Sequence, residues 1–317
     1  MSKNVNKKKY FIITIDTEGD DLWTYKCTRY GLKDILVTNE NGLERFQILC
    51  EKYGFIPTWL VNYEMSQAPL FRELGRSAMM QGKAEIGMHM HAWNNPPIEH
   101  LPFNPKGDHP YIGEYSQKLQ WEKMKFLKGT LEDVFECPIT SFRDGRWYMD
   151  EFLLKCLKKL GILVDCSVTP GISWANNIGN HMYGTDYSRD KFKGYYQLNS
   201  KDIHKVGRTG IYEVPPTIIS KVQISPFKME VKKIWLRPDG HNLEEMLWIV
   251  NRMSKNRDID YIEFMIHSSE LYPGVNPTFK TKKSIDILYR DMDILFHEIS
   301  KNYVGIGLSD YIRTKQL

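Results

Sequence analysis

Residues 10–18 read YFIITIDTE, a run of mostly β-branched and aromatic residues that ends in Asp16 and Glu18. Such a run is typical of a buried β-strand, in which residues two positions apart project to the same side of the backbone. Residues 85–91, EIGMHMH, have the same form and end in His89 and His91. Because the carboxyl ends of parallel strands form the active-site face of α/β folds, we expect these four side chains to converge there.

The whole chain alternates short, β-rich apolar runs with longer segments of helical periodicity. This is the pattern of parallel strands joined by helical crossovers, and about seven such units predict an α/β barrel or a large open sheet. The predicted strands are 10–15, 55–61, 84–89, 139–143, 162–167, 261–267 and 304–308. The predicted helices are 43–50, 70–80, 115–135, 152–160, 243–253 and 285–299.

One segment, 169–239, interrupts this alternation. It is rich in Gly, Asn, Tyr, Trp and Pro, and its clearest strand signal lies at 211–214. We interpret it as an insertion near the C-terminal strand ends that walls the site and determines which substrate is accepted. The sequence contains no internal repeat, Gly/Ser linker or low-complexity tract, so we expect residues 1–317 to form one domain.

The composition is that of a soluble globular protein. Its 317 residues carry a formal net charge of +4, and Lys and Arg are interspersed with Asp and Glu, so we expect no nucleic-acid partner. The apolar run 11–15 is too short for a signal h-region, and no segment approaches the roughly 20 apolar residues of a membrane span. We therefore expect a cytoplasmic protein without a transmembrane segment.

The cysteines are odd in number, widely spaced and free of any CxxC pair, which predicts reduced core residues. Zinc-ribbon and thioredoxin-like classes are therefore poorly supported, and a metal site would have to use His and carboxylate ligands. The five cysteines are Cys27, Cys50, Cys137, Cys156 and Cys166.

Further polar residues lie at or near the ends of other predicted strands: Arg143, Asp144, Asp165 and His267. Two histidines and one carboxylate, with positions left open for water and substrate, suit a catalytic Zn²⁺ or similar divalent ion. Taken alone, an Asp-x-Glu pair also fits a turn or cap, and a strand histidine also fits a hydrogen-bonded core residue. The joint placement of these groups favours the functional interpretation.

The motifs TIDTEG (14–19), EIGMHMH (85–91), SFRDGRW (141–147), VDCSVTP (164–170) and FMIHSSEL (264–271) occur in this order along the chain. Together they resemble the successive motifs of the polysaccharide deacetylase (NodB homology) superfamily, over residues from about 10 to 310. The form of the histidine motif resembles a subgroup that acts in bacterial surface polysaccharide (O-antigen or capsule) biosynthesis. The resemblance implies a distorted (β/α)7-type barrel and a metal-dependent carbohydrate deacetylase, with an acetylated sugar or glycan precursor as substrate.

The resemblance also implies a ligand set, with Zn²⁺ as the expected ion. It matches Asp16 to the catalytic base and Glu18 to a metal-binding carboxylate, although many members carry the ligating Asp at the position of Thr17. The two carboxylates could therefore exchange roles, with Asp16 as ligand. The family's two metal histidines are typically four residues apart, whereas here they are His89 and His91.

The remaining motifs imply the proton-transfer groups. Arg143 matches the arginine that orients and ionises Asp16, with Asp144 where a proline is usual. His267 matches the general acid that protonates the leaving amine. For Asp165 two interpretations stay open: it orients His267, or it caps a buried strand.

Several aromatic residues lie beside the motifs or in the insertion, where their flat faces could stack on sugar rings or simply close the top of the barrel. These are Trp93, Trp147, Trp174 and Tyr183. Two other functions stay open. One is a hydrolase of a glycosidic or a non-sugar C–N bond, since a fold does not fix a function. The other is a carbohydrate-binding pseudoenzyme, suggested by the motif departures at Trp93 and Asp144.

Overall fold

The computed structural model describes all residues except 1–7, 23–34, 103, 105–108, 226–227 and 317. Its main feature is a nine-stranded sheet in the order β10-β1-β2-β3-β4-β5-β7-β6, with β11 also beside β1. Neighbouring strands are parallel except at β6, which runs antiparallel to β7. The strands are β1 (Tyr10–Thr17), β2 (Pro57–Val61), β3 (Glu85–Met90), β4 (Ser141–Asp144), β5 (Val164–Asp165), β6 (Tyr196–Gln197), β7 (Tyr212–Glu213), β10 (Tyr261–His267) and β11 (Val304–Gly305).

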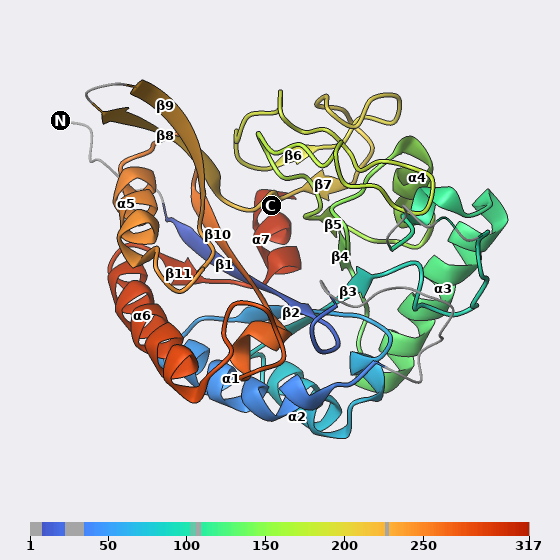
Figure 1. The fold of residues 1–317 in the computed structure, drawn as a ribbon, viewed down its shortest axis with the longest axis horizontal. Coiled ribbons are helices and arrows are strands. Elements are labelled where there is room, and N and C mark those ends of the chain that lie inside the picture. Colours follow the sequence, from blue (N-terminus) through green and yellow to red (C-terminus); the bar gives the residue numbers. More distant parts are fainter. Residues whose placement is uncertain (1–7, 23–34, 103, 105–108, 226–227, 317) are drawn as a thin grey trace.

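Helices cover the outer face of this sheet, as Figure 1 shows. Their apolar faces and the outward residues of the strands form the main core. The helices are α1 (Leu43–Lys52), α2 (Pro69–Met80), α3 (Gln117–Phe135), α4 (Glu151–Lys159), α5 (Leu243–Ser254) and α6 (Lys282–Ser300). The sheet curls through about half a barrel, which confirms the expected barrel-like α/β fold.

The local sequence explains where these helices begin and end. At α4, the Asp150 side chain accepts a hydrogen bond from the backbone N–H of Leu153, 2.6 Å away, and so caps the first turn. Gly161 follows the helix with φ +75°, a left-handed conformation that glycine adopts without strain. The chain is thereby turned directly into β5.

A further helix, α7 (Leu308–Gln316), was not expected from the sequence. Its apolar residues Leu308, Tyr311 and Ile312 pack in a second core against inward-facing strand residues such as Ile12 and Leu60. The Thr58 hydroxyl of β2 also accepts a hydrogen bond from the backbone N–H of Leu308. Helix α7 therefore fills the inside of the curled sheet instead of adding to the outer layer.

The segment predicted as an insertion is largely irregular, and its predicted strand corresponds to β7. It also contains a hairpin that the sequence did not indicate, made of β8 (Ile218–Ser225) and β9 (Lys228–Trp235). Four cysteines are free, three of them buried, whereas Cys27 lies outside the described residues. In the described part of the chain, no helix has the length and apolar character needed to cross a membrane.

Candidate active site

The register of the parallel strands brings the predicted site residues to one edge of the sheet. Asp16 on β1 is the direct neighbour of His267 on β10. His89 on β3 is the direct neighbour of Arg143 on β4. The strand order places β1 and β3 on either side of β2, so these two pairs stand two strands apart at the same end of the sheet.

Glu18, His89 and His91 form a compact buried cluster. One oxygen of Glu18, Oε2, lies 2.6 Å from Nε2 of His91 and 3.2 Å from Nε2 of His89. One ligand atom from each residue lies within 4.8 Å of the other two. This is the pair of histidines and carboxylate that a divalent transition-metal ion prefers.

The hydrogen bonding of His89 shows that the cluster fits a cation. Its Nδ1 lies 3.2 Å from the carbonyl oxygen of Arg143, and a carbonyl can only accept, so Nδ1 carries a proton. In the neutral ring, Nε2 then directs a lone pair at the ionised carboxylate of Glu18. Two facing lone pairs repel each other unless a proton or a metal ion lies between them. Fixing the outer nitrogen of a ligand histidine in this way is typical of protein metal centres.

The electrostatics of the cluster agree with this interpretation. Burial raises the pKa of Glu18, but hydrogen bonds and charge from His89 and His91 outweigh it, and the net pKa is well below its usual value. Burial lowers the pKa of His91 and keeps its ring neutral, the form that binds metals. For His89, burial also lowers the pKa, but the charges of Asp16 and Glu18 outweigh it and raise the net value. Glu18 therefore stays ionised and draws positive charge toward the histidines.

Asp16 is held apart from this cluster by Arg143. The Arg143 Nη1 donates to Oδ1 of Asp16 at 2.7 Å, and both side chains are buried. Two further bonds fix the guanidinium, from Nη2 to Glu263 at 2.8 Å and from Nε to the Cys166 carbonyl at 3.1 Å. Burial raises the pKa of Asp16, but Arg143, together with the nearby histidines, outweighs it and leaves the net pKa below its usual value. Asp16 is therefore an ionised carboxylate, fixed in place.

His267 lies between the two carboxylates and a second charged pair. Its Nε2 is 3.7 Å from Oδ2 of Asp16 and 3.9 Å from Oε1 of Glu18. On the other side of the ring, Nδ1 lies 3.2 Å from Oε2 of Glu270 and 3.1 Å from Nη2 of Arg237. Arg237 can only donate to Nδ1, whereas the carboxylate of Glu270 can only accept from it, so a proton on Nε2 satisfies the first contact and a doubly protonated ring the second.

Sequence reasoning missed both Glu270 and Arg237. Glu270 follows His267 by three residues, and its carboxylate accepts the His267 backbone N–H at 2.8 Å, a capping arrangement with a recognisable spacing. That spacing could have identified it. Arg237 follows the β8–β9 hairpin in a segment without strand periodicity, and no sequence signal indicated it.

Asp165 and Asp144, the other two aspartates at strand ends, make local hydrogen bonds. The hydrogen bonds of Asp165 go to Ser167, 2.7 Å from its hydroxyl, and to the buried Glu213, which agrees with the strand-capping interpretation, whereas Glu270 and Arg237 are the residues in contact with the outer side of the His267 ring. Asp144 accepts the backbone N–H groups of Arg146 and Tyr148 and shapes the turn after β4. Burial raises the pKa of Asp144 to about 7.

A cavity of about 250 Å³ opens above this cluster. Three of the four aromatic residues singled out from the sequence line it, namely Trp93, Trp147 and Trp174. Tyr183 is 57% exposed and does not line it. The rings of Trp147 and Trp174 are parallel to within 4°, with centroids 6.3 Å apart. The cavity therefore combines flat apolar walls with a polar floor, the usual form of a small-molecule site.

Comparison with known proteins identifies the fold. No known protein family matches the sequence, and no curated protein is similar to it. Among solved structures, a protein of Mycobacterium smegmatis described as a polysaccharide deacetylase superposes with a TM-score of 0.52 at 14% identity, over 98% of this chain and 93% of that one. The two share a fold. The resemblance seen in the motifs is thus supported at the level of architecture.

The same architecture also occurs in a protein with a different activity. A 4-α-glucanotransferase of Thermococcus litoralis superposes with a TM-score of 0.57 at 12% identity, over 97% of this chain but 40% of that one. The fold alone therefore does not decide between hydrolysis of an amide and chemistry at a glycosidic bond. The decision rests on the side chains of the site.

Proposed function

We propose that this protein is a metal-dependent hydrolase that removes an N-acetyl or O-acetyl group from a sugar. The observation that carries the proposal is the arrangement of Glu18, His89 and His91 as one cluster beside the Asp16–Arg143 pair. A glycosidase that retains configuration would instead use two free carboxylates about 5 Å apart and no metal. Here the Glu18 carboxylate contacts His89 and His91 and is not a free carboxylate. This arrangement favours hydrolysis of an amide or ester over cleavage of a glycosidic bond.

Glu18, His89 and His91 would hold the ion, for which we propose Zn²⁺. When bound, such an ion polarises the acetyl carbonyl and makes a neighbouring water molecule more acidic. Asp16 accepts the proton of the attacking water, because Arg143 keeps its carboxylate ionised and in place. His267 delivers a proton from Nε2 to the departing amine or alcohol, while Glu270 and Arg237 hold the far side of its ring.

The cavity supports a sugar as the group that carries the acetyl. Trp147 and Trp174 offer flat faces for the ring, and the size of the cavity suits one acetamido sugar. We further propose, on the motif resemblance, that the substrate is a precursor of a bacterial surface polysaccharide. A binding protein without activity remains the rival, and it requires stoichiometric sugar binding with no release of acetate.

Acetate release and metal content, measured together, test the proposal. Purified protein loaded with Zn²⁺ should release acetate from acetylated sugars, and removal of the metal with a chelator should stop the reaction. The variant His89→Ala should bind no metal, whereas His204→Ala, which removes a surface histidine paired with Asp190, should bind one ion per chain. Full metal occupancy in His89→Ala, or sugar binding without acetate release by the loaded protein, would overturn the assignment.

A further inference from the structure

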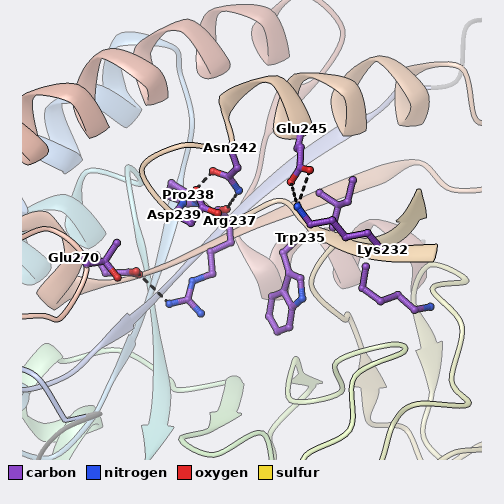
Figure 2. Close-up of a pocket in the computed structure, with 11 residues that line it drawn as sticks. Lys232, Trp235, Arg237, Pro238, Asp239, Asn242, Glu245 and Glu270 are labelled. Atoms are coloured by element: carbon purple, nitrogen blue, oxygen red, sulfur yellow. Dashed lines mark hydrogen bonds and ion pairs between the residues drawn. The ribbon is translucent and has the colours of Figure 1, made fainter. Parts of the chain in front are cut away.

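Arg237 lies where two cavities meet. What we infer from its position rests on the proposed function and specifies the class of substrate. It lines the 250 Å³ cavity above the cluster together with His267. It also lines a neighbouring cavity of about 310 Å³, which is bounded by the end of β9 and the start of α5. Figure 2 shows Arg237 among the residues that line this neighbouring cavity, with its guanidinium turned toward Glu270.

The backbone and one nitrogen of Arg237 are fixed. Its carbonyl oxygen accepts a hydrogen bond from Asn242 Nδ2 at 2.8 Å, as Figure 2 shows. Its Nη2 contacts Glu270 Oε1 at 3.2 Å and His267 Nδ1 at 3.1 Å. These contacts hold the guanidinium plane in one orientation, which reduces the entropy lost when a ligand binds.

The rest of the guanidinium is available. Within the described residues, Nε and Nη1 of Arg237 make no hydrogen bond, and the side chain is 27% exposed at the junction of the cavities. A guanidinium has five N–H donors in a planar fork and no acceptor. Arg237 therefore presents unused, pre-oriented donors directly beside the proton-donating histidine.

The charge around the cavity is positive. Arg146 also lines it, and its guanidinium contacts the carbonyl oxygens of His109 and Ile178 and the ring of Tyr111, with no carboxylate partner among the described residues. Glu18 is the acidic side chain among the described residues lining this cavity, and it is engaged by the two histidines. The walls above the metal cluster thus favour an anionic ligand.

We propose that Arg237 is a specificity-determining residue that binds an anionic group, a phosphate ester or a carboxylate, on the acetylated sugar. Planar guanidinium groups bind both anions through two parallel hydrogen bonds. The sugar that carries the acetyl occupies the cavity over the metal cluster, and the anion lies at the junction. The neighbouring cavity, lined by Lys232, Lys233 and Trp235, then accommodates whatever extends beyond the anion.

If Arg237 only held Glu270 in place, its loss would have a different effect on substrates. Loss of this contact would disturb His267 and weaken turnover of every substrate to the same extent. Loss of an anion contact affects acidic sugars and spares neutral ones. The ratio of affinities for an acidic and a neutral sugar therefore separates the two roles.

The test is titration calorimetry on Zn²⁺-loaded protein that carries Asp16→Asn, so that the sugar is not consumed. The probes are N-acetylglucosamine, N-acetylglucosamine 1-phosphate and 2-acetamido-2-deoxyglucuronic acid. At least one acidic sugar should bind about tenfold more tightly than the neutral one, and the preferred acid identifies the source of the anion. Adding Arg237→Met should abolish this preference, and Arg237→Lys should retain part of it. The control Lys52→Met, which removes a surface charge paired with Asp293 and lines neither cavity, should leave the preference intact.

Steady-state kcat/KM of the otherwise unaltered enzyme for the same sugars provides a second measurement if Asp16→Asn folds poorly. Equal binding of acidic and neutral sugars, or a preference that survives Arg237→Met, would overturn the inference. Failure of the proposed function has a separate signature, because no sugar would then release acetate whatever its charge.

Discussion

Gly145 lies against the face of the His91 imidazole so closely that a Cβ atom added at Gly145 would stand 2.5 Å from Nδ1 and 2.7 Å from Nε2. The glycine cannot easily retreat, because its backbone N–H donates to the Met90 carbonyl at 2.7 Å. The missing side chain at position 145 therefore defines where the His91 ring lies, and with it the geometry of the cluster formed by Glu18, His89 and His91.

The variant Gly145→Ala should consequently push the His91 ring away from Glu18. We expect metal affinity to fall about 10–100-fold, the usual cost of disturbing the groups around a ligand. Competition with a chromogenic chelator measures this. Gly129→Ala in α3 is the matched control, because its added Cβ meets nothing within 4 Å, and it should leave metal affinity unchanged. Wild-type affinity in Gly145→Ala would contradict the packing argument.

Substitutions of Asp16 and Glu18, the two carboxylates of the TIDTEG motif, should have different effects on metal binding. Asp16→Asn keeps the shape of the side chain but removes its basicity, so acetate release should fall about 10²–10⁴-fold while the metal is retained. Glu18→Gln should lose the metal, because the amide cannot replace the anionic ligand between the two histidines. Metal analysis and acetate assays on both variants check this. Loss of metal in Asp16→Asn with retention in Glu18→Gln would show that the two roles are exchanged.

The insertion should act on substrate choice through Trp174 rather than through every aromatic residue that it carries. Trp174 lines the cavity, so Trp174→Ala should change the ratio of kcat/KM for two acetylated sugars without altering metal affinity. Tyr183→Ala is the matched control, since Tyr183 is 57% exposed and does not line the cavity. A ratio that stays constant in Trp174→Ala, with lower thermal stability, would assign that residue a structural role instead.

Stability should depend on pH through Glu64. Burial raises the pKa of this carboxyl to about 7, even though it accepts hydrogen bonds from Gly19, Asn62 and Asn94. A carboxyl with a raised folded-state pKa stabilises the fold fully below its unfolded-state pKa, and this contribution is lost as pH rises through 7. Urea unfolding with a chelator present should therefore show a decline in stability between about pH 5 and 8.

In Glu64→Gln the free energy of unfolding should fall by roughly 2 kcal/mol less between these pH values than in the wild type, since one pKa unit corresponds to about 1.4 kcal/mol. Asp144, whose pKa burial also raises to about 7, contributes a slope of the same sign in both proteins, so the difference between them isolates Glu64. Glu73→Gln on the exposed face of α2 is the control and should leave the slope unchanged. A slope identical in Glu64→Gln and the wild type would contradict the prediction.

The strands and outer helices of this molecule were predictable because the spacing of their apolar residues matches the periodicity of the secondary structure they form. Buried strands such as 10–15 stand out as apolar runs, and parallel strands place Asp16, His89, Arg143 and His267 at one edge by geometry alone. Helix α7 was missed because a short helix that fills the inside of a sheet depends on tertiary packing, which leaves little periodic signal.

The contribution of Arg237 was not predictable for the same kind of reason. Nothing in the sequence around it indicates that an irregular segment after a hairpin returns its side chain to His267. The sequence could place the ends of strands, but not the path of the chain between β7 and β10. Residues that shape a pocket from such segments are found only when the packing is known.

The order of the strands in the sheet sets the order in which the site can form as the chain folds. Glu18 and His91 are 73 positions apart, so the proposed metal ligands belong to the first third of the chain and can meet early. The pairing of β1 with β10, in contrast, joins distant parts of the chain, and just beyond the two strands Glu18 contacts Ser268, 250 positions away. Contacts this distant in sequence close slowly, because a long loop must first be ordered. A partly folded chain can therefore hold Glu18, His89 and His91, the proposed metal ligands, together before His267, the proposed proton donor, has joined them.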